Sequence, residues 1–327
     1  MNPHALPATQ ADAHRPSHRR HRPLWKWLGR AFITVIVALA AWLLLRLLRD
    51  VDWNEVLATL AAYPMITLVG AVVLVACSYL LYGAYDLLGR HYTHHTLSRR
   101  TTAAIAFVAY ACNLNLGPIV GAVGLRLRLY TRYGVRAAQV ARIVGLSFVT
   151  NWSGYLLLGG AVLALRQVEL PPSMSIGTGA LQVLGVLMMA LPVAYVVACA
   201  RSKRREWHVR GHHFRLPAAG TAALQVACAC TNWAVIAGVI WALLPAQVPY
   251  GTVLATFLSA SVVALAAHIP GGLGVLEGVF LYALGDRVAP HTLLAALLAF
   301  RAMYYLLPLA VAGATFFVLE ARARRRG

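Results

Sequence analysis

Long stretches without a single Asp, Glu, Lys or Arg recur along this sequence, and they constrain the fold more than any other feature. The plainest are residues 31–45, 64–85, 143–165, 177–199 and 217–243. A helix needs about 20 apolar residues to cross the hydrocarbon core of a bilayer. Hydrophobic residues make up 60% of the chain and charged residues only 12%, too few to cover the core of a water-soluble fold. The sequence therefore predicts an all-α polytopic membrane protein.

The polar segments are short and divide the chain simply. Residues 1–24 are rich in Pro, His, Ala and Arg without apolar periodicity, which predicts a disordered cytoplasmic tail. Residues 25–320 are predicted to form one transmembrane domain, and residues 321–327 a basic cytoplasmic tail. No polar block is long enough to fold separately, so any activity is expected within the bilayer or at its surface.

The net charge of +19 is distributed in a way that argues for lipid rather than nucleic acid as the partner. The basic residues interrupt apolar runs and do not form one face, and they can contact anionic headgroups. Lys and Arg gather in residues 1–30, 90–100, 201–215 and 321–327, whereas residues 50–63 and 244–250 have none. Positive charge marks the cytoplasmic side, so both termini are predicted to be cytoplasmic.

The region from Thr101 to Arg136 does not fit a plain crossing, because it starts and ends at basic clusters. A re-entrant hairpin that enters and leaves on the cytoplasmic side resolves the conflict. Helix-breaking residues supply its turn, at Gly117, Pro118, Gly121 and Gly124.

The region from Tyr250 to Gly285 has the same form between an uncharged loop and the last apolar segment. It predicts a second re-entrant hairpin, entering from the periplasm. Its break is predicted at Pro270, Gly271, Gly272 and Gly274. The total is about six full transmembrane helices plus two opposed hairpins, where a simple hydropathy count gives eight or more hydrophobic segments.

Opposed broken segments in two halves of a chain are typical of inverted-repeat transporters, whose sites lie near the bilayer midplane. A short repeated tripeptide weakly favours such a repeat here. Thr150-Asn-Trp152 and Thr231-Asn-Trp233 carry the same tripeptide in the two halves.

Ionisable side chains within apolar segments cost about 2.5 to 3.5 kcal/mol each, which makes them functional candidates. Glu277 follows the second break at the start of a half-helix, where the helix dipole favours a carboxylate. Arg301 lies near the middle of the last apolar segment. The two charges predict either a structural ion pair joining the hairpin to the last helix or a pair that opens to bind a headgroup.

Arg126 and Arg128 follow the first break, and Arg binds phosphate through paired hydrogen bonds. They predict a cradle for a lipid phosphate, with simple retention of positive charge on the cytoplasmic side as the alternative. Asp86 is expected to pair with Arg90 or Arg126. Asn113 and His268, at the two breaks, are assigned to the same headgroup path, although interhelical hydrogen bonding explains such Asn residues equally well.

Other chemistry is not indicated. The loop histidines lack carboxylate or Cys neighbours in the sequence and are interpreted as solvated, and the sequence contains no catalytic motif or nucleotide fingerprint. We therefore predict no catalytic residue, no metal and no cofactor, and a protein that is not an enzyme.

Several of these motifs together resemble one family of membrane proteins. They are Val51-Asp-Trp53, Tyr79 to Arg90, Gly124-Leu-Arg-Leu-Arg-Leu-Tyr130, Thr150 to Tyr155, His268-Ile-Pro-Gly-Gly-Leu-Gly-Val-Leu-Glu277 and Phe300 to Tyr305. The resemblance, over residues 25 to 322, is to the family built on the transmembrane region of lysylphosphatidylglycerol synthase, the MprF flippase domain. The Pro-Gly-Gly-x-Gly-x-x-Glu element is the most specific.

The resemblance implies a lipid flippase or transporter with re-entrant helices in a bacterial inner membrane. The synthase's aminoacyl-transferase domain has no counterpart here. The family often has Gly-Glu before the position of Arg126, whereas this chain has Gly121-Ala-Val-Gly124, which favours an anionic phospholipid over a lysyl lipid. The alternative is a non-catalytic lipid-binding scaffold for a partner enzyme or envelope assembly. The possible protein partners are a second copy of the chain, in a homo-oligomer, or an envelope protein.

Overall fold

The structure is a computed structural model that describes residues 52–167, 178–202, 206–209, 212–267 and 270–325. The predicted tail 1–24, the first predicted apolar helix at 31–45 and His268 lie outside these residues. The last helix continues to Arg324, so residues 321–324, predicted to belong to a basic tail, are helical.

The described elements follow one another in a helical chain with one small strand pair. In order they are α2 (Trp53–Ala61), α3 (Met65–Thr93), α4 (Arg99–Leu116), the π-helix η1 (Ile119–Leu125), α5 (Arg126–Arg132), α6 (Ala137–Ala164), α7 (Thr178–Arg201), β1 (Glu206–Val209), β2 (His212–Arg215), α8 (Ala219–Leu243), α9 (Tyr250–Ala267), the 3-10 turn η2 (Pro270–Gly272), α10 (Val275–Leu284), α11 (Pro290–Arg301), the π-helix η3 (Ala302–Leu306) and α12 (Leu307–Arg324). The strands pair antiparallel.

Six of the described helices are long and apolar enough to cross a membrane, which confirms the all-α polytopic fold. They are Met65–Thr93, Ala137–Ala164, Gly179–Arg201, Ala219–Leu243, Tyr250–Ala267 and the continuous Pro290–Arg324. The membership of this set differs from the prediction, because Tyr250–Ala267 was assigned to a hairpin. The length of that helix allows a full crossing, so its role as a re-entrant arm stays a prediction.

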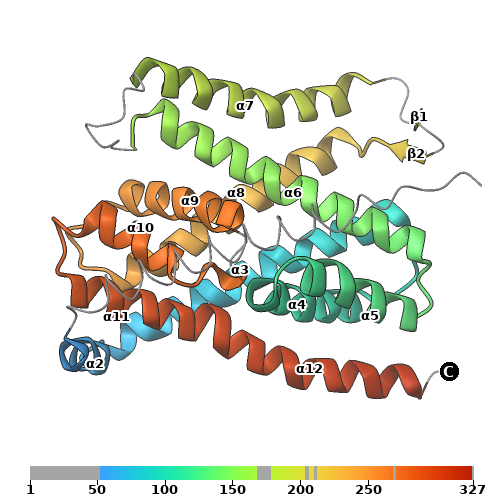
Figure 1. Cartoon of the computed structure of the whole chain (residues 1–327). Helices are drawn as coiled ribbons and strands as arrows, with labels where there is room; N and C mark the ends of the chain where they lie inside the picture. Colours follow the sequence, from blue (N-terminus) through green and yellow to red (C-terminus); the bar gives the residue numbers. More distant parts are fainter. Residues whose placement is uncertain (1–51, 168–177, 203–205, 210–211, 268–269, 326–327) are drawn as a thin grey trace, which may run out of the picture.

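The outward faces of these helices are apolar, as a lipid solvent requires. On α3, for example, Met65, Ile66 and Leu80 are largely exposed. Water would oppose such a surface, whereas hydrocarbon does not. The helices form an elongated bundle in which α3, α6 and α8 pack against one another (Figure 1).

The two ends of this bundle differ in charge. The loops joining α3 to α4 and α5 to α6, the β1–β2 hairpin and the carboxyl terminus lie at one end, and α2 lies at the other (Figure 1). The first end carries Arg99, Arg100, Arg132 and Arg136, and we call it the basic end. Of the basic segments predicted to share one side of the membrane, those that the structure describes therefore share one end of the molecule.

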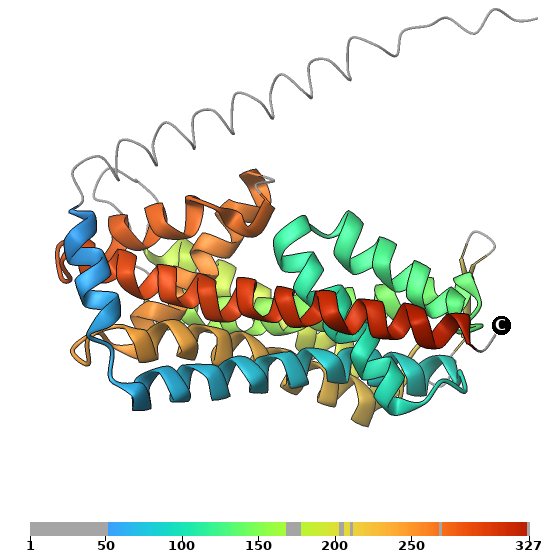
Figure 2. The same cartoon turned by 90° about the horizontal axis from the view of Figure 1, so that it is seen from below.

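Two broken helical hairpins enter the bundle from opposite ends (Figures 1 and 2). Hairpin 1, α4–η1–α5, comes from the basic end, and hairpin 2, α9–η2–α10, from the other end. The chain turns where glycines adopt left-handed backbone angles, at Gly117 (φ +84°) in hairpin 1 and at Gly271 (φ +65°) in hairpin 2. Such angles strain any residue with a Cβ atom.

The other predicted breaks contribute differently. Gly272 and Gly274 are also left-handed, and Pro118 precedes η1. Gly121 is needed for space, because a Cβ atom there would lie 2.1 Å from the backbone nitrogen of Asn113. Gly124 has no positive φ and lies inside η1, so the chain does not break there.

Each half of the chain runs as a long helix, a broken hairpin and a second long helix, with opposite directions in the two halves (Figure 1). This order is the one that an inverted repeat predicts. The repeated tripeptide does not support it, however. Thr150 lies in α6, after hairpin 1, whereas Thr231 lies in α8, before hairpin 2, so the tripeptides do not occupy equivalent places.

Small residues allow α6 to approach its neighbours closely. A Cβ atom on Gly154 would lie 2.5 Å from the backbone carbon of Ala229 in α8, and one on Gly160 would lie 2.5 Å from the carbonyl oxygen of Gly185 in α7. Membrane helices that lack a hydrophobic driving force between them associate through such contacts.

We predict that Gly154→Ala separates α6 from α8 and lowers the free energy of unfolding by about 1–3 kcal/mol, the usual cost of overpacking. Thermal unfolding in detergent micelles measures the effect. Gly145→Ala is the matched control in the same helix, since nothing lies within 4 Å of its added methyl group. Equal stability of the two variants would refute this packing.

Candidate functional site

Glu277 and Arg301 form a buried ion pair between hairpin 2 and the last long helix. Arg301 Nε donates to Glu277 Oε1, and Arg301 Nη2 donates to Glu277 Oε2 at 3.0 Å. Both residues are buried. Paired hydrogen bonds of this kind are the strongest that a guanidinium group makes with a carboxylate.

The same two side chains also satisfy the broken backbone of η2. Arg301 Nη1 donates to the Gly271 carbonyl and Nη2 to the Gly272 carbonyl, each at 2.9 Å. Glu277 is the third residue of α10, and its Oε2 accepts the Gly274 N–H at 2.9 Å. The pair therefore replaces hydrogen bonds that a continuous helix would have made.

Asp86 and Arg126 form a second buried ion pair, between α3 and hairpin 1. Arg126 Nη2 donates to Asp86 Oδ1 at 2.9 Å and Nε to Oδ2 at 3.1 Å, and the side chains are 1% and 0% exposed. Tyr130 donates its hydroxyl proton to Asp86 Oδ2 at 2.8 Å. Arg126 Nη1 donates to the Ala122 carbonyl at 3.1 Å. Of the two partners expected for Asp86, the structure shows Arg126.

The two pairs have reversed polarity. In hairpin 1 the hairpin supplies the Arg and a long helix supplies the carboxylate, whereas in hairpin 2 the hairpin supplies the carboxylate and a long helix supplies the Arg. Each pair joins a hairpin to a long helix. Removing one partner would leave an isolated charge buried, so each junction depends on both of its residues.

Arg126 and Arg128 do not form the single phosphate cradle that the sequence suggested. Arg128 lies on the other side of α5, where its Nε donates to Glu320 Oε1 of α12 at 2.9 Å. Its side chain is 54% exposed, and Arg132 adds a contact of 3.3 Å to Glu320. Two residues apart on a helix, the side chains point in different directions, which the spacing alone could have indicated.

A buried network of hydroxyl groups was not predicted and lies at the centre of the bundle. The Tyr304 hydroxyl lies 2.7 Å from Ser78 Oγ and 2.7 Å from the Tyr110 hydroxyl. Ser78 donates to Asn232 Oδ1 at 2.7 Å, so Asn232 makes the interhelical hydrogen bond considered from the sequence. The network connects α3, α4, α8 and η3.

The π-helix η3 links this network to Arg301, which directly precedes it. Its wide turn leaves carbonyl groups that side chains satisfy. Tyr79 donates to the Tyr304 carbonyl at 3.0 Å, and Asn115 Nδ2 donates to the Tyr305 carbonyl at 3.3 Å. One helical segment therefore contacts hairpin 1 through Asn115 and hairpin 2 through Arg301.

The tips of the two hairpins are neighbours, since η2 packs beside α4. The space between them is small, because a Cβ atom added to Gly271 would lie only 3.4 Å from the Leu114 carbonyl oxygen. Asn113 lies beside this contact, and its buried Oδ1 accepts no hydrogen bond within the described part of the chain. Among the described residues that were predicted to line the headgroup path, Asn113 is thus one with a polar atom free to bind a ligand.

Comparison of the sequence with known proteins assigns the chain to a family. The sequence pattern described as "Lysylphosphatidylglycerol synthase TM region" matches residues 32–312, most of the chain. The chain belongs to this family.

Relatives in the family span a range of similarity. The chain is 38% identical to the Escherichia coli protein "Inner membrane protein YbhN", covering 95% of this chain and 96% of that protein. It is 27% identical to "Uncharacterized protein slr0712" of Synechocystis, with 85% and 87% covered. It is 21% identical to "Phosphatidylglycerol lysyltransferase" of Staphylococcus aureus, where 86% of this chain matches 33% of the enzyme. Membership thus supports a membrane role connected with lipid, and the match to the enzyme is limited to a third of its length.

We predict that Asp86→Asn destabilises the protein by about 3–5 kcal/mol, because the buried Arg126 loses its charge partner. Arg128→Gln, which breaks a half-exposed pair, should cost about 0–1 kcal/mol. Thermal unfolding of both variants in micelles tests the contrast. If Asp86→Asn and Arg128→Gln both unfold at nearly the same temperature as the unaltered protein, the junction of hairpin 1 does not depend on the Asp86–Arg126 pair.

Proposed function

We propose that this protein moves a phospholipid headgroup across the bilayer along the line where the two hairpins meet, with Glu277 and Arg301 as the gate. The observation that carries the proposal is the position of Arg301. Its guanidinium group holds the break of hairpin 2 closed, and the helix that carries it also contacts hairpin 1.

The chemistry of the gate suits a phosphate. A guanidinium group binds phosphate in the same two-pronged geometry that it uses for a carboxylate. A headgroup phosphate can therefore exchange with Glu277 for Arg301, which frees the Gly271 and Gly272 carbonyls and loosens the break. A stable closed pair alone would need no charges, since apolar residues of similar volume often stabilise as well as a buried ion pair.

An anionic phospholipid is the proposed cargo. The segment Gly121–Leu125 before Arg126 has no carboxylate, and the carboxylate that Arg126 does have, Asp86, is occupied by it. A cationic lysyl headgroup would thus find no free acid there. The family and the name of the lysyltransferase relative support lipid handling in general.

The orientation that we propose places the basic end in the cytoplasm of a bacterial inner membrane, with both termini there and residues 25–320 as one domain. The E. coli relative named as an inner membrane protein supports this location. In this orientation hairpin 1 re-enters from the cytoplasm and hairpin 2 from the periplasm.

A second candidate function is a lipid-binding scaffold without transport. It is favoured by the burial of Arg126 and Arg301. In the described conformation both Arg126 and Arg301 are fully engaged with protein acceptors. A protein that stays in this state would hold partners at its basic end without moving lipid. Co-purification of a stoichiometric partner, together with no flipping by the isolated chain, would support the scaffold.

Flipping in reconstituted vesicles tests the transport proposal. In proteoliposomes that contain a fluorescent phosphatidylglycerol, an impermeant reductant removes the outer-leaflet signal without any protein, and flipping should add a rapid loss of the inner-leaflet signal that protein-free vesicles lack. Glu277→Gln and Arg301→Lys should slow this loss at least tenfold, because neither variant retains the two-pronged charged pair.

Glu320→Gln is the matched control, since Glu320 is also a buried, ion-paired carboxylate but lies at the basic end, away from the hairpin contact. We expect it to flip lipid at the unaltered rate. Circular dichroism and gel filtration establish that each variant is folded. Unchanged flipping in folded Glu277→Gln and Arg301→Lys would exclude the gate.

The re-entrant hairpins predict a labelling pattern for single cysteines, introduced after replacement of the five native ones. Ile119→Cys, at the exposed tip of hairpin 1, should react with an impermeant thiol reagent only from the side that labels Thr96→Cys. Leu273→Cys should react only from the side that labels Ala246→Cys. Labelling of either tip from the opposite side would show a plain crossing.

A further inference from the structure

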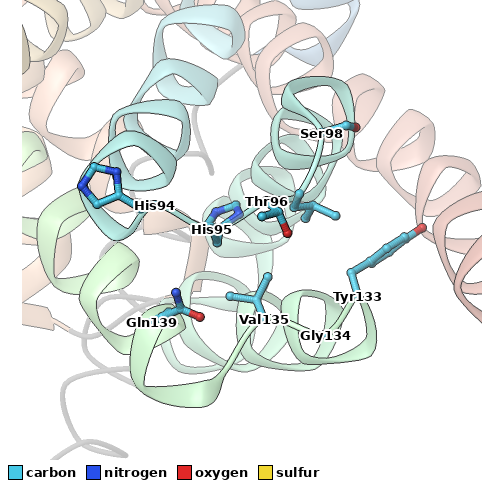
Figure 3. A pocket seen from close by; sticks show the side chains of 9 residues that line it. His94, His95, Thr96, Ser98, Tyr133, Gly134, Val135 and Gln139 are labelled. Carbon is cyan, nitrogen blue, oxygen red and sulfur yellow. The ribbon is translucent and has the colours of Figure 1, made fainter.

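A polar pocket lies at the basic end, well away from the Glu277–Arg301 pair. It has a volume of about 450 Å³ and is formed by residues 94–98 in the loop between α3 and α4, residues 133–135 in the loop between α5 and α6, and Gln139 in the first turn of α6 (Figure 3). The size falls within the usual range of small-molecule sites. Since both loops flank hairpin 1, the pocket sits at the base of that hairpin.

His95 is the unusual residue in its wall. Its side chain is only 7% exposed, yet neither ring nitrogen has a hydrogen-bond partner within the described part of the chain. The ring packs edge-on against Tyr130 at 5.7 Å between centroids. Leaving a buried donor or acceptor unpaired costs about 1–3 kcal/mol. A fold that keeps such a residue beside a pocket gains when a ligand supplies the missing partners.

The charge state of His95 fits this view. Burial lowers its pKa below the ordinary value, the positive charge of Arg90 lowers it further, and Asp86 opposes them more weakly. The ring is therefore neutral near pH 7, with one N–H to donate and one nitrogen to accept. Asp86 is not available to it, because Arg126 and Tyr130 occupy that carboxylate.

The surroundings favour an anion. No Asp or Glu lines the pocket, and its polar lining comes from His94, His95, Thr96, Ser98, Tyr133 and Gln139. Two helices begin at its edge, α4 after Ser98 and α6 after Arg136. Helix amino termini carry partial positive charge and unpaired N–H groups, which bind phosphate in many proteins.

We propose that this pocket binds a phosphate group carried on a small polar molecule, with His95 as a ligand-contacting residue. Its volume leaves room for a phosphate together with an attached glycerol-sized group. The ring nitrogens are covered in the described conformation, so contact requires rotation of the His95 side chain.

Two sources can supply such a phosphate, a phospholipid headgroup at the membrane surface or a soluble phosphate ester. Binding at this pocket does not depend on the proposed transport, because no residue of the hairpin contact lines it. A failure of flipping would therefore leave the pocket proposal intact, and the reverse also holds.

The test uses the full chain in maltoside micelles, which contain no phosphate. The midpoint of thermal unfolding is measured with glycerol 3-phosphate, with short-chain phosphatidylglycerol, and with glycerol plus sulfate at equal ionic strength. Affinity is then measured by calorimetry for the unaltered chain, for His95→Leu and for the control His91→Leu. His91 is exposed and lies one helical turn before His95, outside the pocket lining.

A rise in the unfolding midpoint with glycerol 3-phosphate, kept in His91→Leu and accompanied by at least tenfold weaker binding in His95→Leu, identifies a soluble phosphate ester. The same pattern with phosphatidylglycerol alone identifies a lipid headgroup. His95→Leu without ligand should be at least as stable as the unaltered chain, since it removes an unpaired polar group. No response to either phosphate compound, or an equal response in His95→Leu, overturns the proposal.

Discussion

The fold depends on one constraint, that a helix broken inside a packed apolar bundle must find partners for its freed backbone groups. Arg301 and Glu277 meet this constraint for hairpin 2. The guanidinium group binds two carbonyls of the break, the carboxylate binds an N–H of the same break, and the two side chains bind each other. Structural closure and charge pairing therefore use the same atoms, so a ligand that competes for Arg301 necessarily acts on the backbone of hairpin 2.

Hairpin 1 meets the constraint with the charges reversed, through Asp86 and Arg126. The two hairpins are connected by the last long helix, whose π-helical turn offers carbonyl groups to Tyr79 and Asn115. π-helical turns inside longer helices are frequent at functional sites. This turn lies directly after Arg301, so the residue that closes hairpin 2 is four residues from Tyr305, whose carbonyl accepts a hydrogen bond from hairpin 1.

The core of the bundle is held together by polar as well as apolar contacts. A network of buried hydroxyl groups around Tyr304 joins four elements, α3, α4, α8 and η3. The family and its lipid-related members connect this protein with membrane lipids, which are apolar at one end and charged at the other.

The sequence by itself determined the class of fold, the regions of both breaks and the candidate charges Arg126, Glu277 and Arg301, with Asp86 as an ion-pair partner. It also grouped the half-exposed Arg128 with them and did not single out the buried Glu320. Apolar length and isolated charges are local properties, and the cost of violating them in lipid is large. Only the tertiary structure decided which charges meet. It separated Arg126 from Arg128, brought Glu320 to Arg128, gathered Ser78, Tyr110 and Tyr304, and buried the ring nitrogens of His95 with no hydrogen-bond partner among the described residues. Such pairings depend on the rotation and crossing of helices far apart in the chain, which no local pattern specifies.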